Sequence, residues 1–178
     1  RTVEKPEEIP VGADVIIRSH GEGRATYETL KARKAKVIDA TCPNVTQIHK
    51  IVSQAEKDGR IPVIIGTPDH PEVRAIAGWC SHPVVLRDAE ALDAWLQEDE
   101  SRRNEELTIV SQTTAARAAW EACREKAKKE CTNAKIFDTI CGATDMRQQE
   151  ALRLAEKADA MIVVGDRKSS NTKRLTEL

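Results

Sequence analysis

Two cysteines occupy the same local setting in distant parts of the sequence. In "VIDATCPNV" and in "IFDTICGAT" a short apolar run leads to an aspartate, two residues follow, and then comes Cys42 or Cys141. Free cysteines are often buried as small apolar side chains, but thiolates from separate loops also ligate iron–sulfur clusters. The residues alone therefore leave two interpretations of this pair open, a structural one and a metal-ligating one.

The remaining cysteines, Cys80, Cys123 and Cys131, lack this setting and are interpreted as structural thiols. Five cysteines make an odd number, and the first residues show no basic-then-apolar signal pattern. Neither feature is typical of a secreted disulfide framework. We expect a reducing compartment, the cytoplasm or, in a eukaryote, an organelle stroma such as that of a plastid.

Two histidines and a glutamate lie in short polar motifs. His20 belongs to "SHG", and His70 and Glu72 belong to "TPDHPE". A loop imidazole can donate to a phosphate or move a proton, and the alternative is a solvated loop side chain. Glu72 stands at a helix start, where a carboxylate complements the helix dipole. It is also a candidate proton donor if a dry site raises its pKa. His49 is assigned to the apolar side of a helix.

Hydroxyl and amide side chains mark two further motifs. Thr113 and Thr114 in "SQTT" are candidates for capping the next helix, and a threonine hydroxyl can also relay a proton from a carboxylate. In "GDRKSSNT", Ser169, Ser170 and Asn171 stand at the start of a helix. Free N–H groups at a helix N-terminus with neighbouring hydroxyls bind phosphate, although simple capping explains these residue types as well.

Short β-branched runs alternate with helical stretches, which predicts parallel sheets flanked by helices, an α/β fold. Strands are expected over 13–21, 35–39, 61–66, 83–88, 107–112, 135–140 and 160–166. Helices are expected over 24–34, 44–59, 71–79, 89–97, 115–130, 145–158 and 171–178. Every polar motif follows a strand, and ligands bind at that edge of open parallel sheets. The motifs are therefore expected to converge, in one sheet or in several small lobes.

Charge and hydropathy exclude some classes of partner. The 178 residues include 28 basic and 29 acidic side chains, a net charge of −1. Nucleic acids and membrane surfaces attract a basic excess, so neither is an expected partner. No apolar run approaches the roughly 20 residues of a membrane-spanning helix.

In this order and spacing, "SHG", "DATCP", "GTPDHPEV", "SQTT", "DTICGATDMRQ" and "VVGDRKSSNTKRL" resemble the 4-hydroxy-3-methylbut-2-enyl diphosphate reductase family, from Asp14 to Leu178. The resemblance implies three α/β lobes in a trefoil around a [4Fe–4S] cluster. It implies reductive dehydroxylation of the allylic diphosphate to isopentenyl and dimethylallyl diphosphate, the last step of non-mevalonate isoprenoid biosynthesis. Electrons would come from a ferredoxin- or flavodoxin-type donor.

The resemblance also implies residue roles. Cys42 and Cys141 match cluster ligands, Glu72 matches the proton donor, and Thr113 matches the threonine near the substrate hydroxyl. The positions that match diphosphate contacts are His20, His70, Ser169, Ser170 and Asn171. The third cluster cysteine and another histidine of the family site would precede Arg1, and a further serine would follow Leu178. We therefore expect an incomplete chain that is inactive by itself.

Lobe boundaries are expected at 1–42, 43–137 and 138–178, which correspond to the end of a first lobe, a second lobe and the start of a third. Two other hypotheses compete with the reductase. One is a non-catalytic α/β module that binds a phosphorylated ligand, with inert cysteines. The other is a structural zinc site formed by Cys42, Cys141 and His70, although zinc requires a fourth ligand that the sequence does not supply.

Overall fold

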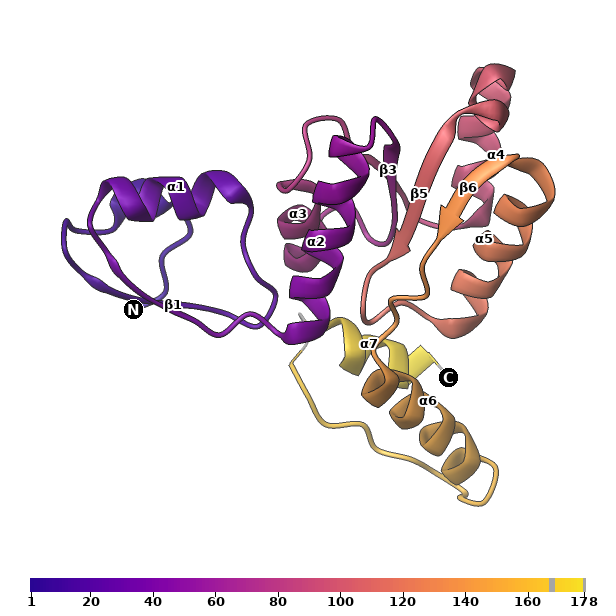
Figure 1. The fold of residues 1–178 in the computed structure, drawn as a ribbon. Helices are drawn as coiled ribbons and strands as arrows, with labels where there is room; N and C mark the ends of the chain where they lie inside the picture. Colours follow the sequence, from indigo (N-terminus) through magenta and orange to yellow (C-terminus); the bar gives the residue numbers. More distant parts are fainter. Residues whose placement is uncertain (167–168, 178) are drawn as a thin grey trace.

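A four-stranded parallel sheet forms the centre of the protein. The computed structural model describes residues 1–166 and 169–177. The sheet contains β3 (Ile61–Ile65), β4 (Val84–Leu86), β5 (Glu106–Ser111) and β6 (Asn133–Ile136), in the spatial order β4-β3-β5-β6. All of its strand pairs are parallel (Figure 1). The predicted α/β fold of small parallel sheets flanked by helices is confirmed.

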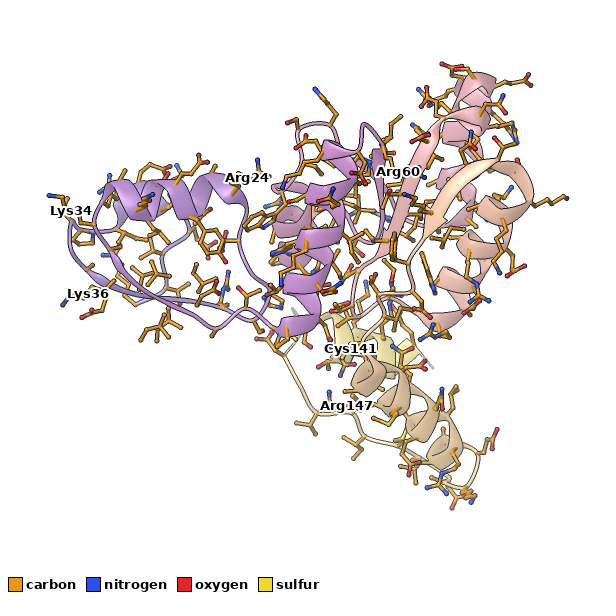
Figure 2. The ribbon with its side chains drawn as sticks, in the orientation of Figure 1. Arg24, Lys34, Lys36, Arg60, Cys141 and Arg147 are labelled. Atoms are coloured by element: carbon orange, nitrogen blue, oxygen red, sulfur yellow. The ribbon has the colours of Figure 1, made fainter. Side chains whose placement is uncertain are left out.

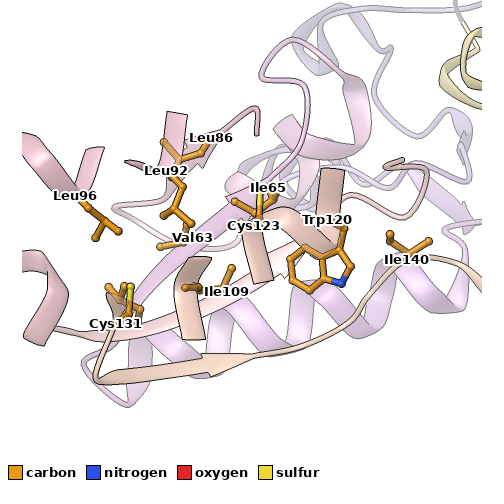
Figure 3. Packing of buried hydrophobic residues seen from close by; sticks show 12 residues of the cluster. Val63, Ile65, Leu86, Leu92, Leu96, Ile109, Trp120, Cys123, Cys131 and Ile140 are labelled. Atoms are coloured by element: carbon orange, nitrogen blue, oxygen red, sulfur yellow. The ribbon is translucent and has the colours of Figure 1, made fainter. Parts of the chain in front are cut away.

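Helices cover both faces of this sheet. On one side lie α2 (Pro43–Lys57) and α3 (Pro71–Ala77), and on the other lie α4 (Ala89–Glu98) and α5 (Arg117–Glu130) (Figure 1). Alternate residues of a strand point to opposite faces. The strand side chains on one face of the sheet therefore pack against Trp120 and Cys123 of α5 in one apolar cluster (Figure 3). The cluster on that side includes Val63, Ile65, Leu86, Leu92, Leu96, Ile109, Trp120, Cys123 and Cys131, and the cluster on the other side includes Ile48, Val52, Ile64, Val73, Ile76 and Val110.

Local signals explain the helix boundaries. Pro43 occupies the first turn of α2, where its missing N–H is not needed. Gly59 follows the helix at φ +71°, a left-handed conformation that suits glycine and ends the helix. Asp88 caps α4, because its side chain accepts a hydrogen bond from the Ala91 N–H at 2.9 Å. A short 3-10 helix, η2 (Glu100–Asn104), lies in the charged stretch between α4 and β5.

A second, smaller sheet lies toward the N-terminus. After the 3-10 helix η1 (Pro6–Glu8), β1 (Asp14–Ile17) and β2 (Lys36–Asp39) pair in parallel, and α1 (Arg24–Ala32) connects them (Figure 1). Ile16 and Ile38 face each other across this pair and remain 68% and 62% exposed. Within the described residues, this sheet therefore has an uncovered apolar face.

The C-terminal part consists of α6 (Gly142–Ala155) and α7 (Ser170–Glu177), which lie next to each other beneath the end of β6 (Figure 1). The strand predicted over 160–166 is wrong, since these residues adopt no regular structure and Ile162 is 88% exposed. A strand needs a neighbour to pair its backbone groups, and no described strand lies beside this segment. Among the described helices, none has both the length and the apolar character needed to cross a membrane.

Candidate active site

A buried carboxyl group and a threonine link the ends of two elements. Glu72, in the first turn of α3, is 2% exposed, and Thr113 follows β5. The Thr113 N–H donates to one carboxylate oxygen of Glu72 at 2.6 Å, and its hydroxyl donates to the other at 2.7 Å. Burial raises the pKa of Glu72 above its usual value, against the lowering effect of these two hydrogen bonds. Neither Thr113 nor Thr114 caps α5, because Ala116 is its N-cap.

His70 caps α3, the helix that carries Glu72. Its Nδ1 accepts a hydrogen bond from the Glu72 N–H at 3.2 Å, so the proton of the neutral ring lies on Nε2. The ring of His20 meets that of His70 edge-on, with the centroids 5.5 Å apart. Burial lowers the pKa of both histidines, and Arg18 lowers that of His20 further. Two neutral imidazoles therefore lie together, and Nδ1 of His20 is buried without a partner among the described residues.

The N-terminus of α7 lies against the "SQTT" turn. The Thr114 hydroxyl donates to Ser170 Oγ at 3.1 Å, and Gln112 Nε2 donates to the same oxygen at 3.4 Å. Ser169 Oγ accepts the Thr172 N–H at 3.2 Å, which is the capping interaction considered for this residue type. Asn171 Oδ1 is buried and has no partner within the described residues. Gln112 was not among the sequence candidates, because nothing in its sequence position distinguishes it from a surface amide.

Both cysteines of the repeated motif are N-cap residues, Cys42 of α2 and Cys141 of α6. Asn44 Nδ2 donates to Cys141 Sγ at 3.3 Å, so the starts of the two helices lie side by side. The N–H of Thr144 lowers the pKa of the Cys141 thiol most, and the Ala143 N–H and the Asn44 amide lower it further. Figure 2 shows Cys141 where β6, α2 and α6 meet.

The repeated "D-x-x-C" spacing has a backbone explanation. The Asp39 carboxylate accepts the Thr41 N–H at 2.9 Å, and Asp138 accepts the Ile140 N–H at 3.3 Å. Each aspartate thus forms a tight turn with the residue two positions on, and a cysteine then starts a helix. The shared aspartate therefore gives the two cysteines the same local backbone setting.

Backbone hydrogen bonds connect the cysteines to the other motifs. The Cys42 N–H donates to the Ser19 carbonyl at 3.0 Å, one residue before His20, and the Cys141 N–H donates to the Thr113 carbonyl at 2.9 Å. Together with the His20–His70, Glu72–Thr113 and Thr114–Ser170 contacts, these bonds connect the described residues of the motifs to one another. Asn44 was not predicted from the sequence, since its partner lies 97 positions away.

The cysteines outside the repeated motif are packed. Cys123 and Cys131 belong to the cluster beneath the main sheet, and Cys80 is half-buried near α3. Burial raises the pKa of the Cys80 and Cys123 thiols to about 11. Within the described residues, no group of three or more histidine, cysteine or acidic side chains is arranged to hold a metal ion. A zinc site formed by Cys42, Cys141 and His70 is therefore not supported.

The two cysteines nevertheless fit part of a thiolate-ligated cluster. Both are free and half-buried, and helix N–H groups stabilise the thiolate of Cys141. Beside them are a buried carboxyl group with a raised pKa, neutral imidazoles and the N-terminus of α7. This combination can ligate a metal with sulfur on one side, bind an anion on the other, and hold a proton between them.

The family model described as "LytB protein" matches residues 1–178. Among curated proteins, 4-hydroxy-3-methylbut-2-enyl diphosphate reductase of Clostridium tetani is 39% identical over 168 residues, which cover 94% of this chain and 25% of that protein. The protein of the same name from Clostridioides difficile is 36% identical, over 100% of this chain and 63% of that protein. The chain therefore spans less than two thirds of each of these relatives.

Solved structures agree with the family match. The E-1-hydroxy-2-methyl-but-2-enyl-4-diphosphate reductase from Plasmodium falciparum superposes with a TM-score of 0.88 at 29% identity, over 98% of this chain and 55% of that one. A structure of (E)-4-hydroxy-3-methyl-but-2-enyl diphosphate reductase, named the terminal enzyme of the non-mevalonate pathway, gives a TM-score of 0.70 at 34% identity, over 97% of this chain and 60% of that one.

Proposed function

The chain belongs to the LytB protein family, and from that premise we propose that the full-length protein reduces 4-hydroxy-3-methylbut-2-enyl diphosphate to isopentenyl and dimethylallyl diphosphate. One observation carries the proposal. Thr113 binds Glu72 through its N–H and hydroxyl, and its carbonyl accepts the N–H of Cys141. The carboxyl group of a candidate proton donor and the backbone of a candidate metal ligand are thus hydrogen-bonded to the same residue.

The diphosphate of the substrate is assigned to the two histidines and the start of α7. Neutral His70 offers an Nε2–H donor, and the unpartnered Nδ1 of His20 is available beside it. Ser169, Ser170 and Asn171 add side-chain donors to the free N–H groups of the α7 N-terminus. A diphosphate needs several donors at once, and a helix N-terminus with adjoining hydroxyls supplies them.

Cys42 and Cys141 would hold a [4Fe–4S] cluster together with a third cysteine outside this chain. When bound, such a cluster supplies electrons and a Lewis-acidic iron, and we propose a ferredoxin- or flavodoxin-type protein as its electron source. The chain's own contribution is to stabilise the Cys141 thiolate through helix N–H groups and the Asn44 amide.

Glu72 would provide the proton for the leaving oxygen. Breaking the allylic C–O bond consumes two electrons and two protons and releases water, so the departing hydroxyl must receive a proton. The raised pKa of Glu72 favours the protonated carboxyl, and the Thr113 hydroxyl between the carboxyl and the substrate relays its proton. Burial around this pair excludes the water that would otherwise compete.

The lobe boundaries at 1–42, 43–137 and 138–178 and a cytoplasmic or organelle-stromal location also stay proposals. In this division each lobe contributes a different part of the site. The first contributes His20 and Cys42, the second His70, Glu72 and Thr113, and the third Cys141 and the start of α7.

Turnover by the full-length protein tests this function. The protein is reconstituted anaerobically with iron and sulfide and supplied with substrate and a reduced viologen dye, and mass spectrometry measures the two products. Glu72→Gln keeps the shape but cannot donate the proton, so kcat should fall at least about 100-fold. Glu90→Gln, in the first turn of α4, is the matched control and should retain full activity. Absence of either product from the unsubstituted protein would contradict the proposal and favour a non-catalytic phosphate-binding module.

A further inference from the structure

Residues 22–24, which follow His20, pack closely against Gly78 and Trp79 at the end of α3, and we call this contact the seam. The Arg24 N–H donates to the Gly78 carbonyl at 3.1 Å, and the Trp79 indole N–H donates to the Glu22 carbonyl at 2.9 Å. The Arg24 guanidinium donates to the Trp79 carbonyl at 3.0 Å. A Cβ atom added to Gly78 would lie 2.7 Å from the Cα of Gly23, so the two backbones touch. This seam joins the small sheet to the main one, and Figure 2 shows Arg24 on the α1 side of it.

An aromatic stack lies beside the seam. His49, on α2, is 4% exposed, and its ring stacks on Trp79 with centroids 5.1 Å apart and planes 20° from parallel. Tyr27 contacts the same indole at 5.7 Å between centroids. Burial lowers the pKa of His49 to about 4, against the opposing effect of Asp39, so the ring is uncharged at neutral pH. His49 therefore acts as a flat packing surface between the two sheets.

Gly21 rests directly on this stack. It adopts φ +72°, and an added Cβ would lie 2.7 Å from His49 Cε1 and 3.0 Å from Thr41 Cγ2. The residue that follows His20 therefore has no space to move toward α2. Its position is determined by the ring of His49, which in turn rests on Trp79.

The seam and the histidine pair lie at opposite ends of one short helix. His70 caps the start of α3, and Gly78 and Trp79 follow its last turn, where the Gly78 N–H donates to the Arg74 carbonyl at 3.0 Å. His20 stands two residues before Glu22, the first residue held in the seam. The spacing between the rings of His20 and His70 thus depends on the contact at Trp79.

We propose that His49 and Trp79 are positioning residues that hold His20 at the correct distance from His70 for the two to bind one anion together. The inference rests on the proposed function, in which this pair contacts the diphosphate. Neither His49 nor Trp79 touches the anion. A change at the seam should weaken diphosphate binding while leaving the proton donor, Glu72, in place.

The first test compares two glycines in the full-length protein, with inorganic diphosphate as the probe. Gly21→Ala pushes a methyl group against His49 and should raise the Kd measured by calorimetry about tenfold, since misplacement by an ångström is costly. Gly59→Ala is the matched control. It has a similar φ of +71° but nothing within 4 Å of the added Cβ, so its Kd should stay within about twofold of the unsubstituted value.

A more conservative variant tests the same contact in case Gly21→Ala does not fold. Trp79→Phe keeps an aromatic ring but removes the N–H that binds the Glu22 carbonyl, and should raise the Kd about threefold through that one lost hydrogen bond. The control is Trp95→Phe, which changes a half-buried tryptophan on α4, away from the seam. It should leave the Kd for diphosphate unchanged. For the substrate itself, KM should rise in both seam variants while kcat stays within about twofold, because only binding is affected.

Two further variants separate this inference from the proposed function. His20→Ala and His70→Ala should each weaken diphosphate binding more than the seam variants do. If neither does, the assignment of the pair to the diphosphate fails. If both do, and Gly21→Ala and Trp79→Phe bind diphosphate as tightly as their controls, the positioning role of the seam is overturned. Melting temperatures of all variants identify any that are unfolded. If Gly21→Ala is unfolded, the Kd of Trp79→Phe alone decides whether the seam has the positioning role.

Discussion

The two parallel sheets of this protein differ in how they are covered. Helices bury both faces of the four-stranded sheet, so Val63, Ile64 and Ile109 are inaccessible to solvent. In the two-stranded sheet every residue of β2 is exposed, and Ile16 and Ile38 present an apolar face. The pairing of the strands is the same in both, so the difference lies in burial, which supplies most of the stabilising free energy.

This difference extends to the candidate site. Glu72 and His70 are held by contacts within the well-covered half, to Thr113 and to the start of α3. His20 extends from the thinly covered half and depends on the seam at Trp79 for its position. The candidate site therefore has one side, at Glu72 and His70, that is held by contacts within the four-stranded half. The other side, at His20, has a geometry that depends on packing between the two sheets.

The largest expected effect is on the stability of the 178-residue chain. Trp120→Ala leaves a cavity beneath the four-stranded sheet and should lower the free energy of unfolding by about 3–5 kcal/mol. Ile16→Ser, on the uncovered face, should change it by less than about 0.5 kcal/mol. Urea denaturation followed by circular dichroism measures both. A large loss with Ile16→Ser would show that another copy of the chain covers this face in solution.

A smaller effect is expected on the pKa of Glu72, on the side of the site next to the four-stranded sheet. Because the folded-state pKa of Glu72 is raised, protonation of Glu72 stabilises the fold, fully so below the usual carboxyl pKa, and this contribution is lost as pH rises through the raised value. Thr113→Val removes the hydroxyl that stabilises the charged carboxylate, so the pKa should rise further. The same change removes the hydroxyl proposed to relay the proton, so kcat should fall, and the titration of Glu72 itself reports the shift.

Carbon-13 NMR of labelled glutamate in the full-length protein measures this shift. Thr113→Ser keeps the hydroxyl and serves as the control, with a pKa close to that of the unsubstituted protein. If the pKa of Glu72 in Thr113→Val is unchanged or falls, the hydrogen bond does not govern the proton on this carboxyl group.

The sequence predicted the elements well where their stabilising contacts are local. The alternation of short β-branched runs with helical stretches predicted the parallel sheets and the helices that flank them. It failed over 160–166, where β-branched residues indicate a strand but no neighbouring strand is present among the described residues. Strand formation depends on pairing, which local composition does not reveal.

For the site, the motifs that follow strands were predictable because parallel strands bring their ends together. The contacts that connect them were not. Asn44 reaches Cys141 across 97 positions, and His49, correctly placed on the apolar side of its helix, stacks on Trp79 from another element. Such contacts arise from tertiary packing, and neither the residue type nor its spacing contains that information.

Our main proposal is that Cys42 and Cys141 ligate one cluster, where the starts of α2 and α6 lie side by side. The most direct measurement is the iron content and visible absorption of full-length protein reconstituted anaerobically with iron and sulfide. Cys42→Ser and Cys141→Ser should each lose most of the bound iron and the brown colour, whereas Cys131→Ser, a change in the packed core, should keep both. Iron binding by Cys42→Ser and Cys141→Ser equal to that of the unsubstituted protein would contradict the account.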